Sequence, residues 1–251
     1  MFTRSDERET SEAYRRLWRD QRPGMLCQRF LMGPVGTFLL NTPLFLLQRR
    51  LGISSRHRLL EIGCGRGAGL RVLAARIPFQ RPPVGIDLAP AALELAQRDG
   101  SAGSPMVLLA VAATRLPFAR ESFDLILSTH MVKHLSDAAI HRFFFESWRA
   151  LRPGGVLIVW EFAPTRSRLL NRFHRWLLTA DVKTCRLRGY GDFVDLAIES
   201  RFMNMENLTL RPYLFPPIPR TGFLLKKAAD VEPAEQGAEV PAQASGNRLE
   251  P

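Results

Sequence analysis

The chain has 251 residues, an apolar fraction of 46% and a formal net charge of +11, which suits one substantial globular core. Its three cysteines, Cys27, Cys64 and Cys185, are odd in number and far apart, which excludes a disulfide framework and a cysteine pair with metal-ligand spacing. The polar, charged start (MFTRSDERET) does not resemble a signal peptide. We therefore expect a cytoplasmic protein without a metal ion.

The charge is unevenly distributed. The acidic residues outnumber the basic ones in residues 228–251, so the rest of the chain is more basic than the net charge indicates. The excess of basic residues outside this segment favours anionic partners, such as nucleic acid, a membrane surface or an acidic substrate. An Arg-rich coding bias with a solvated surface explains the same composition, so charge alone does not choose among these.

The first 57 residues contain a polar helical stretch (10–21) and a strongly apolar stretch (28–48). Glycines and prolines, Pro34 and Pro43 among them, interrupt the apolar stretch, so it makes a poor membrane span. We predict two short amphipathic helices instead, and we interpret residues 1–57 as a helical lid.

From residue 58 the chain alternates between apolar runs of strand length and helical patterns. We expect strands at 58–62, 83–87, 106–111, 123–128 and 155–160, and helices at 67–77, 90–98 and 136–151. Such alternation predicts an α/β fold with a parallel sheet covered on both faces. Later we expect helices at 165–179 and 191–204 and strands at 207–215 and 220–226, followed by a disordered acidic tail, 228–251.

The turn after the first strand carries three glycines at alternate positions: Gly63, Gly65 and Gly67. In a doubly wound fold this turn lies where ligands bind, and glycine lets a ligand approach the backbone closely. The next strand ends in Asp87, a carboxylate that can accept hydrogen bonds from both hydroxyls of a ribose. The pattern predicts a nucleoside ligand.

Two classes of nucleoside ligand compete for this site: a dinucleotide such as NAD and S-adenosylmethionine (SAM). The glycine spacing satisfies the dinucleotide pattern only loosely. The carboxylate of Glu61, just before the glycines, would repel a pyrophosphate but attract the ammonium of SAM. A titration with NADH would reveal the dehydrogenase alternative.

Four stretches resemble the class I SAM-dependent methyltransferases, in particular the small-molecule group that includes the ubiquinone and menaquinone enzymes. They are LLEIGCGRGAG (59–69), VGIDLA (84–89), LPFARESFDLILS (116–128) and LRPGGVLIV (151–159). The resemblance implies a Rossmann-like, doubly wound sheet of seven strands and a SAM-binding domain over residues 58–227. It also implies SAM as the methyl donor.

Site residues follow from the same resemblance. Glu61, Gly63, Cys64, Gly65 and Gly67 would hold the methionine end of SAM. The ribose and adenine would contact Asp87, Leu88, Ala112 and Ala113, and the methyl group would be bordered by Ser128, Thr129 and His130. Relatives commonly carry an acid where this chain has Ala112, so we expect SAM affinity to be lower by about 1 kcal/mol, the worth of one hydrogen bond.

His130 is the candidate general base. A base is needed only where the acceptor arrives protonated, and a histidine at the mouth of the sheet could serve. A structural histidine bonded to backbone is the alternative. We expect His134 to orient the loop, His57, His141 and His174 to lie at the surface, and Cys64 to be small filler.

Apolar blocks in residues 28–47 and the basic amphipathic stretch 165–179 favour a small hydrophobic acceptor, such as a lipid, quinone, isoprenoid or polyketide. The second stretch has the composition of an interfacial helix, which predicts peripheral contact with an anionic membrane. Core-forming helices are the alternative. A nucleic-acid methyltransferase is disfavoured, because Ser128-Thr129-His130-Met131 replaces the motif of base-amino methylators. A non-catalytic relative of the fold is a third alternative.

Overall fold

The computed structural model describes residues 51–100, 105–178, 185–202, 204–208 and 219–229, with isolated positions at 12, 30, 35 and 36. Seven strands form one sheet in the order β3-β2-β1-β4-β5-β7-β6. The strands are β1 (Leu59–Ile62), β2 (Val84–Asp87), β3 (Val107–Ala110), β4 (Phe123–Thr129), β5 (Leu151–Phe162), β6 (Asn204–Asn207) and β7 (Arg220–Lys226).

Strands β1 to β5 are parallel and β7 is antiparallel to both of its neighbours. The helices are α4 (Ala68–Ala74), α5 (Pro90–Gly100), α6 (Asp137–Ala150), α7 (Arg168–Leu178) and α8 (Tyr190–Ile198), with a short 3-10 turn, η1 (Val132–His134). The strand order reverses between β1 and β4, which is where open α/β sheets bind ligands. The predicted doubly wound, seven-stranded sheet is confirmed.

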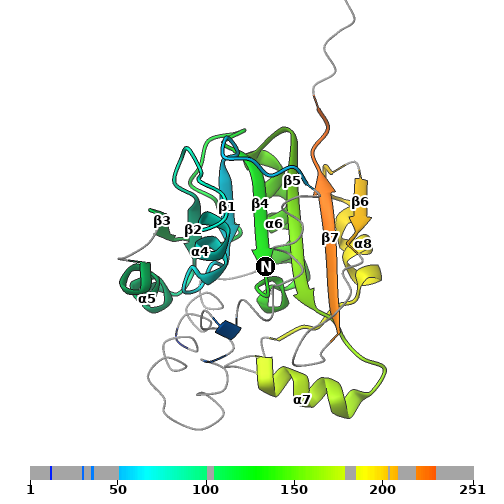
Figure 1. Ribbon diagram of the computed structural model, residues 1–251. Coiled ribbons are helices and arrows are strands. Elements are labelled where there is room, and N and C mark those ends of the chain that lie inside the picture. Colours follow the sequence, from blue (N-terminus) through cyan, green and yellow to red (C-terminus); the bar gives the residue numbers. More distant parts are fainter. Residues whose placement is uncertain are drawn as a thin grey trace, which may run out of the picture.

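Each face of the sheet has its own apolar core, because the strand residues alternate between the two faces. On one face Leu70 and Leu73 of α4 pack with Leu59 and Trp160. On the other face Phe143 and Phe144 of α6 and Phe193 of α8 pack with residues such as Leu60 and Phe223. Figure 1 shows α4 and α6 on opposite sides of the central strands.

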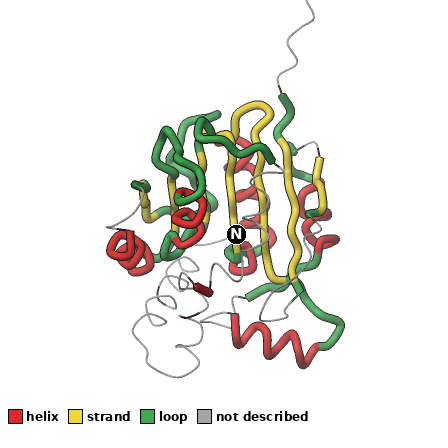
Figure 2. The backbone as a smooth tube through the Cα atoms, viewed as in Figure 1, coloured by secondary structure: helices red, strands yellow, loops and turns green. Residues whose placement is uncertain are grey.

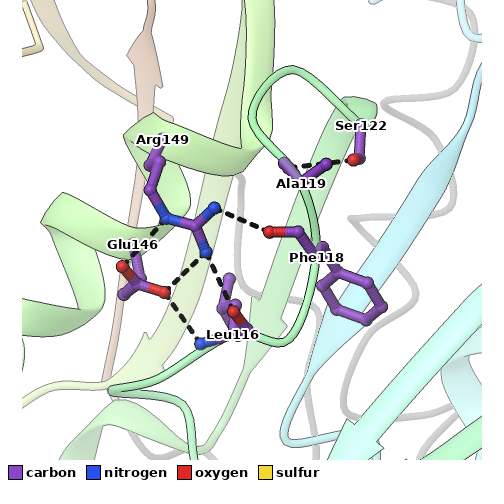
Figure 3. A network of polar contacts seen from close by, with 6 residues as sticks. All are labelled: Leu116, Phe118, Ala119, Ser122, Glu146 and Arg149. Carbon is purple, nitrogen blue, oxygen red and sulfur yellow. Dashed lines mark hydrogen bonds and ion pairs between the residues drawn. The ribbon is translucent and has the colours of Figure 1, made fainter.

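Helix α6 holds the loop that leads into β4 (Figure 3). The guanidinium of Arg149 donates to the carbonyls of Leu116 at 2.9 Å and Phe118 at 2.6 Å. Glu146, paired with Arg149 at 2.8 Å, accepts from the backbone amide of Leu116 at 2.8 Å. This network fixes the loop of the motif at 116–128. The helix starts as predicted, with the Ser136 hydroxyl accepting from the amide of Ala139.

Two predicted boundaries were wrong. Strand β5 begins at Leu151, not at 155, because a register shift opposite Phe123 lets pairing continue through the Pro-Gly-Gly sequence, where Gly154 takes φ +75°. The predicted helix over 191–204 ends at Ile198, and a strand, β6, occupies Asn204–Asn207, just before the predicted strand over 207–215, most of which is not described. Residues 209–218 lie outside the described ranges.

The flanking segments are largely undescribed. Most of the predicted lid (1–57) and of the tail (228–251) falls outside the described residues, including nearly all of residues 28–47. Helix α7 is described and lies beyond the end of the sheet, apart from both of its faces (Figures 1 and 2). Within the described residues, every helix is too short or too polar to cross a bilayer.

Candidate active site

The three glycines after β1 all adopt left-handed backbone conformations, with φ of +78° at Gly63, +53° at Gly65 and +66° at Gly67. Side chains disfavour this region, so the pattern of alternate glycines has a direct conformational cause. The amides of Gly63 and Cys64 both donate to the carbonyl of Ile86, which ties the loop to β2.

Space around the loop differs from one glycine to the next. A Cβ on Gly63 would lie 2.4 Å from Cγ of Met131, so this glycine is needed for packing. A Cβ on Gly65 would meet no atom within 4 Å. Gly65 therefore presents bare backbone to open space, as a ligand-contacting position requires.

Glu61 is enclosed beneath the start of α4, with only 2% of its surface exposed. Its Oε1 accepts a hydrogen bond from the Thr129 hydroxyl at 3.2 Å. Its Oε2 has no hydrogen-bond partner among the described residues. Burial raises the pKa of Glu61 to about 8. A buried carboxylate oxygen without a partner favours a cationic ligand, and the ammonium of SAM has this chemistry.

Asp87 at the end of β2 connects two parts of the site. Its Oδ2 accepts from the amide of Gly65 at 2.8 Å and its Oδ1 from the amide of Ala89 at 2.9 Å. The second bond is a local, cap-like contact at the start of α5, whereas the first bond orients the glycine loop. Burial raises the pKa of Asp87, against these two amides. Each oxygen keeps acceptor capacity for a ribose hydroxyl.

The predicted adenine contacts lie along the same edge. Leu88 follows Asp87 and is half-buried, as are Ala112 and Ala113 after β3. The amide of Val111 donates to the carbonyl of Asp87 at 3.0 Å, which holds the turn after β3 against the end of β2. The structure therefore brings Leu88 and Ala112 to adjacent strand ends.

Cys64 is 7% exposed and packs with the α4 face of the sheet. Burial raises the pKa of its thiol well above the ordinary value. The thiol therefore stays protonated and unreactive near neutral pH, which agrees with its interpretation as a small packing residue. Among the described residues, no group of His, Cys, Asp and Glu is arranged to hold a metal.

The three predicted site residues at the end of β4, Ser128, Thr129 and His130, differ in their burial and in their polar contacts. Ser128 is 1% exposed, and within the described ranges its hydroxyl has no hydrogen-bond partner. Thr129 faces Glu61. His130 takes φ +54°, a strained conformation for a residue with a Cβ, and its amide donates to the carbonyl of Trp160. Strain of this kind gathers at functional sites.

The His130 ring stacks on Phe162, with ring centroids 4.2 Å apart. Its side chain is 14% exposed and its Nδ1 lies 3.8 Å from Oε1 of Glu161. Neither ring nitrogen has a hydrogen-bond partner in the described part of the chain. The alternative in which backbone groups bond the ring is therefore not observed. Burial lowers the pKa of His130 to about 4, so the imidazole is neutral at pH 7.

Glu161 is the functional candidate that sequence reasoning missed. It is fully buried at the end of β5, where its oxygens accept from the amides of Lys133 at 2.9 Å and Phe162 at 2.8 Å. The Lys133 ammonium lies 3.7 Å away. Burial raises the pKa of Glu161, but Lys133 and His130 outweigh it and lower the pKa to about 2. An acid directly after the apolar run GVLIVW is the signal, since Glu61 also lies near the carboxyl end of its own strand, after apolar residues.

The remaining histidines divide into two groups. His134 lies in η1, as expected for a residue that shapes the loop, and burial lowers its pKa to about 3. His57 and His141 are partly exposed. The expectation that His174 lies at the surface was wrong, because only 5% of it is exposed.

Comparison with known proteins identifies the same region. The family described as "Methyltransferase domain" matches residues 60–159. A demethylmenaquinone methyltransferase from Tropheryma whipplei (strain Twist) is 32% identical over 130 residues, 52% of each chain. The aklanonic acid methyltransferase DauC of Streptomyces sp. (strain C5) is 39% identical over 84 residues, 33% of this chain and 38% of that one. The chain spans about half the length, or less, of these curated relatives.

Solved structures share the fold. Haemonchus contortus phosphoethanolamine N-methyltransferase 2 in complex with S-adenosyl-L-methionine has a TM-score of 0.60 at 17% identity, over 80% of this chain and 60% of that one. A protein from Bordetella parapertussis has a TM-score of 0.59 at 20% identity, over 85% of this chain and 72% of that one. Residues 60–159 therefore match a methyltransferase domain, and the sheet order and the glycine loop of the chain agree with that match.

Proposed function

We propose that this protein transfers the methyl group of SAM to a nucleophilic atom of a small, hydrophobic acceptor. The observation that carries the proposal is the buried Glu61, whose Oε2 lacks a hydrogen-bond partner among the described residues and lies against Gly69 at the start of α4. A dinucleotide site would place a pyrophosphate at such a loop, where a buried carboxylate is unfavourable.

Glu61 would hold the ammonium of SAM, with Thr129 orienting the carboxylate through Oε1. Asp87 would accept from the ribose hydroxyls while its bond to the Gly65 amide keeps the loop in place. Leu88 and Ala112 would enclose the adenine. When bound, SAM supplies an electrophilic methyl group, so the protein's main contribution is to hold the acceptor in line with it.

His130 is the proposed general base for an acceptor that arrives protonated. Its imidazole is neutral at pH 7, and 14% of its side chain is exposed, although both ring nitrogens are buried in the ligand-free protein. The buried carboxylate of Glu161, 3.8 Å from Nδ1, would stabilise the imidazolium that forms. Lys133 keeps Glu161 ionised, because its ammonium lowers the pKa of that carboxyl.

The hydrophobic class of the acceptor rests on similarity. The relatives act, by their names, on demethylmenaquinone, on aklanonic acid and on phthiotriol dimycocerosates. These are a quinone, a polyketide and a lipid, in agreement with the apolar stretches of the sequence. The identity of the acceptor atom, O, N or C, is left open.

The test uses SAM labelled on its methyl group, mixed with the protein and a total cell extract. We expect protein-dependent label in the organic-solvent phase, and we expect His130→Gln to reduce it without loss of SAM binding. Label in water-soluble molecules or in RNA would overturn the hydrophobic acceptor. No transfer by a protein that binds SAM, across extracts from several growth conditions, would count against the enzyme.

A further inference from the structure

Helix α7 turns its apolar side chains away from the domain. Leu169 is 80% exposed, Phe173 51% and Trp176 53%. These three residues lie on one face of the helix, since they are separated by three, four and seven positions. The rings of Phe173 and Trp176 are 5.8 Å apart, so the face presents a continuous aromatic and aliphatic surface.

The opposite side of α7 carries a local capping contact and a buried histidine. Asn171 Oδ1 accepts from the amide of Thr165 at 2.6 Å, and its Nδ2 donates to the carbonyl of Thr165 at 2.9 Å. One turn later His174 is buried. Asn171 therefore caps the start of the helix, and the buried His174 lies on a different side of the helix from Leu169, Phe173 and Trp176.

The positive charge of α7 indicates which class of partner its exposed apolar face would bind. The helix, RLLNRFHRWLL, contains three arginines and no acidic residue. Arg168 and Arg172 are exposed along one border of the apolar face, and Arg166 is exposed just before the helix. Two copies of this surface would bring like charges together. An anionic lipid surface offers apolar chains for the aromatic face and phosphates for the arginines.

We infer that α7 docks on the surface of an anionic phospholipid bilayer. The helix follows β5 after a five-residue connection, at the edge of the sheet that carries His130 and Phe162 (Figure 1). Docking through α7 would therefore turn the carboxyl ends of β4 and β5, where His130 and Phe162 lie, toward the lipid. On the proposed function, on which this last step rests, a hydrophobic acceptor would reach the site directly from the membrane.

The first test is flotation of the full chain with vesicles of phosphatidylcholine, with and without phosphatidylglycerol. We expect binding to the anionic vesicles at low salt and its loss at high salt, because salt screens exposed charges. Leu169→Ser with Phe173→Ser should weaken binding at least about tenfold, since both side chains lose their burial in lipid. Ile198→Ser on α8, which is 74% exposed, is the matched control and should bind like wild type.

Charge and fluorescence give independent readouts. Arg168→Glu with Arg172→Glu should abolish binding, whereas Arg142→Glu on α6 should change it little. The tryptophan emission should shift to the blue on anionic vesicles, and Trp176→Phe should remove most of that shift.

The inference fails if wild type ignores anionic vesicles at low salt, or if the α7 variants bind as well as wild type. It also fails if sedimentation shows a dimer that the Leu169 and Phe173 changes dissociate, because the face would then bind a second copy. Vesicle binding needs neither SAM nor turnover. Binding to anionic vesicles without any methyl transfer would therefore contradict the proposed function but support α7 as a docking surface.

Discussion

The hydroxyl of Thr129 at the end of β4 donates to Oε1 of Glu61 on β1, 3.2 Å away across two neighbouring parallel strands. The bond orients a carboxylate that is 68 positions away in sequence and leaves its Oε2 without a partner among the described residues. A cation bound at Oε2 would favour the ionised form of this carboxyl, whose pKa burial raises to about 8 in the ligand-free protein.

Replacing Glu61 by Gln should weaken SAM binding about 10- to 100-fold, because a charge-assisted hydrogen bond to the ammonium becomes a neutral one. Calorimetry of SAM binding measures this directly. Glu94→Gln on the exposed side of α5 is the control and should bind SAM like wild type. Equal affinities for wild type and Glu61→Gln would remove Glu61 from the site.

The raised pKa of Glu61 also predicts how stability depends on pH. The carboxyl has a pKa of about 8 in the folded protein and an ordinary value of 4.5 when unfolded. Unfolding therefore releases a proton between these values, and the stability of the ligand-free protein falls as the pH rises through that window. Glu61→Gln should lack this loss and exceed wild type by on the order of 3 kcal/mol at pH 8.

Denaturant unfolding of both proteins at pH 5 and pH 8 measures the difference. The variant should gain on wild type as the pH rises. A constant gap between the two proteins would mean that Glu61 is already ionised in the folded state.

Gly65→Ala separates ligand contact from backbone strain. Its φ is +53° and its Cβ would meet no protein atom, so the cost in stability is about 1–2 kcal/mol of left-handed strain. Gly154→Ala, at φ +75° and also in open space, carries the same strain far from the loop. We expect similar losses of stability in chemical unfolding, but a large loss of SAM affinity in Gly65→Ala alone.

His130→Gln should lower kcat on the order of 100-fold, the usual contribution of a general base, with SAM affinity retained. His141→Gln on α6 is the control and should keep full turnover. Because burial lowers the pKa of His130 to about 4, the imidazole of wild type remains unprotonated near neutral pH. We therefore expect its rate to stay level on mild acidification and to fall only as the pH approaches 4. Full turnover by His130→Gln would remove the proposed role.

The glycine loop and the order of strands and helices could be predicted, because residue type and short-range sequence pattern determine them. The glycine loop needs left-handed backbone at Gly63, Gly65 and Gly67, and only the residue type matters. The alternation of apolar runs with helical patterns predicts the parallel sheet for the same reason. Strand β6 could not be predicted, because it is an edge strand whose residues remain partly or fully exposed and lack a hydrophobic signature.

Long-range features could not be predicted. Glu161 becomes an ionised, buried group only because η1, 28 positions earlier, places the Lys133 ammonium beside it. The burial of His174 and the exposure of Leu169 likewise depend on where α7 lies relative to the rest of the protein. Amphipathic periodicity gives the two faces of a helix but not which of them meets the protein.

Titration of the ligand-free protein with SAM and, separately, with NADH tests the assigned site most directly. Saturable binding of SAM, weakened in Glu61→Gln and unaffected in Glu94→Gln, together with no binding of NADH, is the predicted result. Binding of NADH without binding of SAM would contradict the assignment of the glycine loop and its buried carboxylate to a methyl donor.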